Sequence, residues 1–287
     1  MFTFLGTSAG EQYPGVWCNC SNCSKARKLG GRNIRRNSCA AIGDHTLIDF
    51  GPAIPIQLDQ QGLSLLNVDT LLITHAHDDH FLPWYLRWRL FPPHQTTNPQ
   101  GYEKGPLFTK PLPLTIYGSE TVRERTLGAI KQDPVNHHLE IKVFELWTPV
   151  QTKHLVCTPI LANHDFRQDC FNFIIEYKER TILYAVDTAW FLPETMEFLK
   201  QYQFDIVVME GTFGFNEQHD FMTAGHCNFL ANRQAREWML TENLIEESVP
   251  FIITHTGPHH APPHDECAPL LEKWGLCLAY DGMQLEP

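Results

Sequence analysis

The sequence has no apolar run long enough to span a bilayer and no recognisable secretion signal. A membrane-spanning helix needs about 18–20 consecutive apolar residues, and no such run occurs in the 287 residues. Residues 1–6 are apolar, but they lack the basic segment and long apolar stretch of a signal peptide. We therefore expect a cytoplasmic protein without a membrane partner, in which residues 1–6 form the first strand.

Basic residues are also scarce. The chain has 22 Lys and Arg against 33 Asp and Glu, a formal net charge of −11. Binding to a nucleic-acid backbone depends on a basic surface, so we expect no nucleic-acid partner. A small phosphorylated substrate remains compatible with this charge, because a bound metal ion neutralises phosphate locally.

The cysteines do not suggest a disulfide framework. There are nine, an odd number, and Cys18, Cys20 and Cys23 fall within six positions. This arrangement favours metal ligation in a reducing compartment. Three such thiolates can converge on one structural zinc, which then needs a fourth ligand from elsewhere in the chain. The alternative is a loop with three free thiols.

Apolar, β-branched runs alternate with polar turns and predict a layered α/β protein. We expect a hairpin over residues 171–186, helices at residues 119–131, 193–201 and 226–244, and a long loop near residues 92–113. Two sets of strands with interspersed helices predict sheet packed on sheet with helices outside. We expect one domain over residues 1–287, with the loop as an insertion. The expected strands are residues 46–50, 70–73, 114–117, 141–144, 155–157, 171–175, 181–186, 205–209 and 251–253.

The segment 74–80 is the richest in metal-ligand side chains. His75, His77, Asp78, Asp79 and His80 directly follow the apolar run 68–73. Imidazole and carboxylate groups are good ligands for zinc and similar divalent ions. A polar turn with solvated histidines is the alternative.

Further candidate ligands follow other apolar runs. His164, Asp187 and His255 each stand just after such a run, where a rigid strand would hold the side chain toward the loop side. Each residue alone is weak evidence, but these three runs and the run before His75 together indicate a metal centre. Asp49, at the end of the run 47–49, is a candidate partner for a histidine N–H, or else a turn residue.

The pattern His-x-His-x-Asp-His at residues 75–80 resembles the signature of the metallo-β-lactamase superfamily. The resemblance implies an αββα sandwich and two divalent ions, which zinc, manganese or iron would suit. It assigns His75, His77 and His164 to one ion, and Asp79, His80 and His255 to the other. Asp187 would bridge them, the two ions would share a hydroxide, and Asp78 receives no ligand role.

The N-terminal segment indicates which group within the superfamily the chain resembles. Gly6-Thr7-Ser8-Ala9-Gly10, the cysteine cluster and Arg35-Arg36-Asn37-Ser38-Cys39 resemble the start of PhnP-type phosphodiesterases. In that pattern the fourth structural zinc ligand is a histidine just beyond the last catalytic one. Here the spacing is one residue longer, which leaves His259 and His260 as alternatives, with His259 favoured. PqqB proteins begin similarly but depart from His-x-His-x-Asp-His, which is intact here.

The segments 207–213 and 224–228 resemble the phosphodiesterase branch of the superfamily, which includes tRNase Z. The resemblance implies that His226, at the start of the long helix, binds phosphate or protonates the leaving group. Glu210 would orient His226, and Asp79 would act in catalysis as well as bind metal. An ordinary first-turn residue is the alternative for His226.

We therefore expect a metal-dependent phosphodiesterase that hydrolyses small phosphate diesters, cyclic ones included. The expected partners are a small phosphorylated substrate and, where the chain self-associates, a second copy in a homodimer. The alternatives are a PqqB-like accessory protein of cofactor biosynthesis and a metallo-hydrolase that acts on another ester or a thioester.

Overall fold

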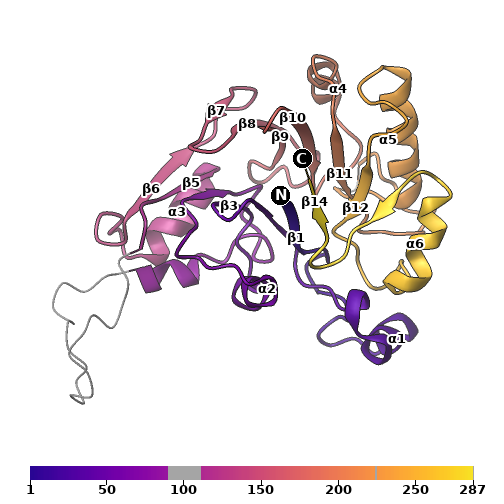
Figure 1. Cartoon of the computed structure of the whole chain (residues 1–287), viewed down its shortest axis with the longest axis horizontal. Helices are drawn as coiled ribbons and strands as arrows, with labels where there is room; N and C mark the ends of the chain where they lie inside the picture. Colours follow the sequence, from indigo (N-terminus) through magenta and orange to yellow (C-terminus); the bar gives the residue numbers. More distant parts are fainter. Residues whose placement is uncertain (90–110, 224, 287) are drawn as a thin grey trace.

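The computed structural model describes residues 1–89, 111–223 and 225–286. In these residues the strands form two seven-stranded sheets. The first sheet runs from β14 at one edge to β6 at the other (Figure 1). Strands β3 to β6 are parallel, so all four carboxyl ends point in the same direction and lie side by side. In sheet order the strands are β14 (Gln284–Leu285), β1 (Phe2–Gly6), β2 (Cys39–Ile42), β3 (Thr46–Ile48), β4 (Thr70–Leu72), β5 (Leu114–Gly118) and β6 (Leu139–Val143).

The second sheet combines a parallel half with an antiparallel half. Strands β10 to β13 are parallel, and the β9–β10 pair is the expected hairpin, with Lys178 and Glu179 in its turn. The order is β13 (Cys277–Leu278), β12 (Phe251–Thr254), β11 (Ile206–Glu210), β10 (Arg180–Ala185), β9 (Phe171–Tyr177), β8 (Val156–Leu161) and β7 (Val150–Gln151).

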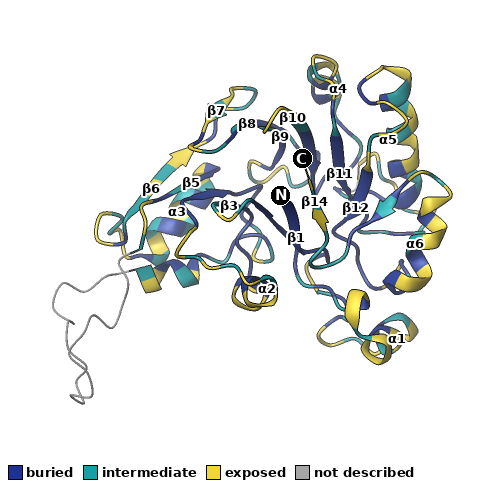
Figure 2. Cartoon of the chain, viewed as in Figure 1, coloured by how far each residue is buried: buried dark blue, intermediate teal, exposed yellow. Residues whose placement is uncertain are grey.

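Helices cover the outer face of each sheet. A buried cluster joins α2 (Ile54–Gln61) and α3 (Glu120–Ala129) to the first sheet, and a second joins α4 (Pro193–Leu199), α5 (Phe229–Thr241) and α6 (His264–Glu272) to the other. A third cluster, which contains Phe4 from β1 and Tyr184 from β10, lies between the sheets. The central strands are accordingly buried on both faces, whereas the edge strands β6, β7 and β14 are partly exposed (Figure 2). The architecture is the expected αββα sandwich. Helix α1 (Ser21–Leu29) and two 3-10 turns, η1 (Gly31–Asn33) and η2 (Pro83–Arg89), complete the described elements.

Side-chain alternation explains why these segments are strands. In β10, Ile182 and Tyr184 join the cluster between the sheets, whereas Leu183 and Ala185 join the cluster under the helices. Successive side chains of a strand point to opposite faces. A strand segment with both faces covered is therefore apolar throughout, as residues 182–185 of β10 are.

The expected strands are present, with ends that differ by up to four residues, and the expected helices at 119–131 and 193–201 are α3 and α4. The helix expected at 226–244 is α5, which is three residues shorter at each end. It begins at Phe229, because the Asn228 side chain accepts a hydrogen bond from Ala231 N at 2.8 Å and caps it.

Three helices were missed. Helix α6 contains Pro269, a residue that usually disrupts a helix interior. Helices α1 and α2 are short, and each buries only two or three side chains. Of the expected insertion at 92–113, residues 92–110 lie outside the described residues. No described helix is long and apolar enough to cross a membrane.

Candidate metal centre

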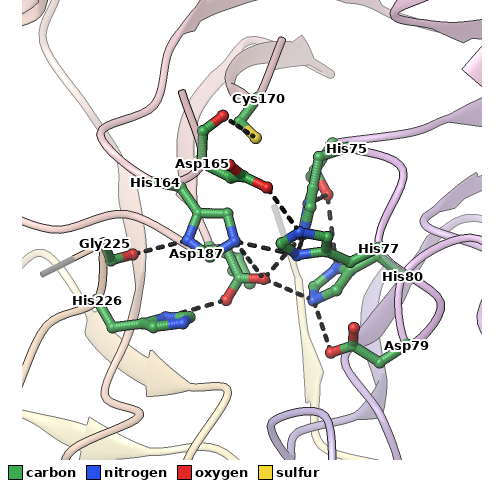
Figure 3. Close-up of polar contacts among 12 residues, drawn as sticks. His75, His77, Asp79, His80, His164, Asp165, Cys170, Asp187, Gly225 and His226 are labelled. Carbon is green, nitrogen blue, oxygen red and sulfur yellow. Dashed lines mark hydrogen bonds and ion pairs between the residues drawn. The ribbon is translucent and has the colours of Figure 1, made fainter. Parts of the chain in front are cut away.

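The expected ligands gather where strands of both sheets end. The chain leaves β4 at Leu72 and reaches His75 three residues later. His164 follows β8, Asp187 follows β10 and His255 follows β12 in the same way. Figure 3 shows the histidines that follow β4 and β8 gathered around Asp187.

The first group of ligand atoms contains His75, His77, His164 and Asp187, all within 4.8 Å of one another. His77 Nδ1 lies 2.9 Å from His75 Nε2 and 3.2 Å from His164 Nε2. Asp187 Oδ2 lies 3.2 Å from His75 Nε2. These are the four side chains that the resemblance places around the first ion.

The second group contains Asp79, His80, His255 and again Asp187. His80 Nε2 lies 2.9 Å from Asp187 Oδ2, 3.3 Å from Asp79 Oδ2 and 3.2 Å from His255 Nε2. His255 Nε2 lies 3.0 Å from the other oxygen, Asp187 Oδ1. Asp187 therefore belongs to both groups, as a bridging carboxylate must.

The donor atoms fit divalent metal ions. Imidazole ligands of zinc, each 2.0–2.1 Å from the ion, lie about 3.3 Å apart in a tetrahedral site. The nitrogen–nitrogen separations here are 2.9 to 3.2 Å. Burial opposes charge on His80, but the carboxylates Asp187, Asp79 and Asp49 raise the pKa of His80 well above its usual range. The site thus favours positive charge at the point where an ion would bind.

Asp49 holds His80 from behind, as expected. Asp49 Oδ2 lies 2.7 Å from His80 Nδ1, and its Oδ1 accepts a hydrogen bond of 2.8 Å from Thr74 N. Both carboxylate oxygens are buried. This contact fixes the ring so that Nε2 faces the ligand group.

A corresponding carboxylate for His77 was missed. Asp165 Oδ2 lies 3.1 Å from His77 Nε2 (Figure 3), and Arg167 Nε donates a hydrogen bond to Asp165 Oδ1 at 2.8 Å. His77 therefore directs Nδ1, not Nε2, into the ligand group. The only signal in the sequence was an acidic residue directly after His164. Asp78, which had no expected ligand role, forms an ion pair with Arg125 at 2.6 Å.

Three site residues adopt a left-handed backbone. The φ angles of Asp49, Asp187 and His255 are 67°, 55° and 50°. Non-glycine residues rarely occupy this region, and the conformation costs on the order of 1–3 kcal/mol per residue. Each of the three lies just past a strand end, where the turn directs its side chain toward the other ligands.

His226 lies beside the metal ligands, two residues before the cap of α5. Its Nδ1 is 2.8 Å from Glu210 Oε1 and 3.5 Å from Asp187 Oδ1. Glu210 is fully buried and accepts backbone hydrogen bonds from Thr188 N and Thr212 N. Burial disfavours charge on His226, but the Glu210 carboxylate raises the pKa of His226 to about 9. Since Nδ1 is engaged by Glu210, Nε2 remains for a substrate.

An open cavity of about 390 Å³ adjoins the ligands. Small-molecule sites typically have volumes of about 300–1,000 Å³. His226 lines the cavity, together with Glu11, Phe213 and His260. A small substrate there would contact the metal ligands and His226 at once.

The cysteine cluster forms a separate group. Ligand atoms of Cys18, Cys20 and His259 lie within 4.8 Å of one another, and Cys23 N is 3.5 Å from Cys20 Sγ. Burial raises the pKa of Cys20, but hydrogen bonds from the Cys23 amide and the Cys18 thiol outweigh it and lower the value to about 7. Of the two histidines left open by the sequence, the structure places His259 at the cysteines.

Similar proteins have the same fold. A diphosphatase of the PhnP family superposes with a TM-score of 0.73 at 18% identity, covering 99% of this chain and 95% of that one. Zn²⁺-bound PqqB from Methylobacterium extorquens gives 0.68 at 16% identity, covering 100% and 99%. A ribonuclease Z from Brevibacillus brevis is 25% identical over 189 residues, which are 65% of this chain and 50% of that protein. The match thus spans about half the length of that curated relative.

The chain has the metallo-β-lactamase fold, like the PhnP-family protein, and its described residues include two His/Asp groups that could hold metal ions. Residues 38–224, well over half of the chain, match the family described as Anti-Pycsar protein Apyc1. The chain belongs to that family.

Proposed function

We propose that the protein hydrolyses small phosphate diesters, cyclic ones included, at a site with two divalent ions. The observation that carries this proposal is the His226–Glu210 pair, 2.8 Å apart, beside the double ligand group. His75, His77 and His164 would hold one ion, and Asp79, His80 and His255 the other. Asp187 would contact both. Bound there, such ions neutralise phosphate charge and make water a better nucleophile.

Glu210 and His226 have two further roles in the proposed reaction. Glu210 holds the His226 ring through Nδ1 and is itself fixed by two backbone N–H groups. His226 Nε2 is then placed to give a proton to the leaving oxygen, or to donate a hydrogen bond to a phosphate oxygen. Asp79 is the most exposed ligand of the second group, with 21% of its side chain accessible, and borders the same cavity.

Charge and cavity size favour a small substrate over a nucleic acid. The net charge is −11, and none of the described residues that line the cavity is Lys or Arg. A long polyanion is normally held by a basic track. A single phosphate diester can instead be neutralised by the two ions themselves.

An accessory role in cofactor biosynthesis, like that suggested by the PqqB likeness, is the second candidate. It predicts a single bound ion and no turnover of any diester. Elemental analysis of protein purified without added metal distinguishes the two, because the phosphodiesterase proposal requires two ions besides any held by the cysteines.

Replacement of His226 tests the role of the His226–Glu210 pair. His226→Ala should keep the metal content of the wild type and lose roughly 10²–10⁴-fold in rate on alkyl phosphate diesters. The loss should be smaller on bis(p-nitrophenyl) phosphate, whose leaving group needs no proton. Equal losses on both substrates would contradict proton donation and leave phosphate binding as the role of His226.

A further inference from the structure

Each histidine of the two ligand groups has a polar partner at the ring nitrogen that does not join its group. The partner is a carboxylate for two of the rings, a backbone carbonyl for one and a threonine hydroxyl for the other two. The pairs are His77 with Asp165, His80 with Asp49, His164 with the Gly225 carbonyl, His75 with Thr74, and His255 with Thr212. Thr212 differs from a simple partner because it also contacts the His226–Glu210 pair.

The Thr212 hydroxyl holds both the ring and the backbone of His255. Thr212 Oγ1 lies 2.8 Å from His255 Nδ1 and donates a hydrogen bond of 3.1 Å to the His255 carbonyl oxygen. A histidine that binds metal through Nε2 carries its ring hydrogen on Nδ1. Oγ1 then accepts that hydrogen while it donates its own to the carbonyl. The hydroxyl is therefore fully used when His255 is in the tautomer that binds metal.

The fold places Thr212 and His255 side by side. They follow β11 and β12, two neighbouring parallel strands in which Glu210 pairs with Thr254. His255 leaves its strand with a φ angle of 50°, a conformation that non-glycine residues rarely adopt. Its carbonyl, turned by this conformation, is the group that accepts from Thr212. The hydroxyl thus stabilises the backbone turn together with the direction of the ring.

Glu210 connects Thr212 to His226. Thr212 N donates a hydrogen bond of 2.9 Å to Glu210 Oε2, whereas Glu210 Oε1 lies 2.8 Å from His226 Nδ1. Thr212 Oγ1 lies 3.4 Å from His226 Nδ1. The rings of His226 and His255 are nearly parallel, with planes 14° apart and centroids 5.9 Å apart. One buried carboxylate therefore fixes both rings, His226 directly and His255 through Thr212.

We propose that Thr212 is a positioning residue for the second ion, the one assigned to Asp79, His80 and His255. Its hydroxyl directs His255 Nε2 into that ligand group and, through Glu210, keeps the group in register with His226. Thr212 binds no ion itself. The inference rests on the two-ion site proposed above, and it adds the side chain that sets the affinity of one of the two ions.

Metal affinity of the full-length protein tests this role. Thr212→Val keeps the shape of the side chain and removes the hydroxyl, so one of the two catalytic ions should bind roughly 10–100-fold more weakly. Competition of the zinc-loaded protein with a chromophoric chelator measures each ion. Thr212→Ser keeps the hydroxyl and should bind both ions nearly as tightly as the wild type does. Thr241→Val, at an exposed threonine of α5, is the matched control.

Turnover distinguishes this role from that of His226. At limiting Zn²⁺, Thr212→Val should hydrolyse an alkyl phosphate diester more slowly than the wild type, and excess Zn²⁺ should restore most of the rate. His226→Ala should not respond to added Zn²⁺. Two ions in the wild type with equal affinities in Thr212→Val, or an equal loss of affinity in Thr212→Ser, would overturn the role of Thr212 alone. A wild type that binds one catalytic ion would overturn the two-ion site as well.

Discussion

Asp187 is the residue on which both candidate metal groups depend. Its two oxygens contact histidines of both groups, and only 3% of its side chain is exposed. The ligands were predictable from the sequence because imidazole and carboxylate side chains follow apolar strands. Asp49 was also a candidate, but the partner of His77 was not found, because the His77–Asp165 contact joins residues 88 positions apart. Such contacts depend on how two loops pack.

Asp165 should matter for metal affinity although it binds no ion. Asp165→Asn leaves His77 without its anionic partner, so we expect metal affinity or turnover to fall roughly 10–100-fold. Competition with a chromophoric chelator measures the affinity. Asp169→Asn, at an exposed neighbouring position, is the control, and equal affinities in the two variants would refute the role of Asp165.

Asp281 should make stability depend on pH. Asp281 is partly buried, and the loss of solvation there raises the pKa of Asp281 to about 7, although Arg36 N and Thr7 Oγ1 donate hydrogen bonds to it. Between about pH 4 and pH 7 the Asp281 carboxyl is therefore protonated in the folded state. In the unfolded chain, where its pKa is about 4, it has lost the proton over the same pH range. Its contribution to stability is present below pH 4 and is lost as pH rises toward and past 7.

Asp281→Asn removes this dependence, because the amide stays neutral. Between pH 5 and pH 8 we expect the stability of the variant to rise relative to the wild type by up to roughly 3 kcal/mol. Denaturant unfolding at the two pH values measures the difference. A difference between the two proteins that does not change with pH would contradict the assignment.

Among the elements, strands were predicted better than helices. Residues 182–185 of β10 are a short apolar run, and a run of that length favours a buried strand over a helix. Helix α6 carries Pro269 in its interior, and α1 is stabilised at its start by Cys20, whose side chain accepts from Cys23 N. Local periodicity does not reveal a helix that contains an interior proline, or one that is capped by a cysteine side chain.

The segment around α1 should depend on its metal ligands. Cys20→Ser should remove one zinc ion per chain and lower the thermal midpoint, because the binding free energy of a structural ion is partly folding free energy. Molecules that still fold should keep most of their turnover. Cys277→Ser, outside the cluster, should retain its zinc, and elemental analysis with thermal unfolding distinguishes the variants. If Cys20→Ser keeps its full zinc content, the cysteines do not bind the structural zinc ion.

At the scale of the whole molecule, the sandwich explains why ligands distant in sequence meet. Strands β4 and β10 belong to different sheets, yet the residues that follow them, His75 and Asp187, approach within 3.2 Å. Apolar runs alone indicated sheet packed on sheet, but they did not indicate the order of the strands within each sheet. The identity of the substrate could not be predicted, because many activities share this fold.

The central claim is that this double metal group cleaves phosphate diesters. The most direct test is turnover by metal-loaded protein of bis(p-nitrophenyl) phosphate and of 2′,3′-cyclic nucleotides, with a thioester and a lactam in parallel. We predict hydrolysis of the diesters, loss of that activity by orders of magnitude in Asp187→Ala, and a folded variant by circular dichroism. Opening of the thioester or the lactam, with both diesters left intact, would contradict the account.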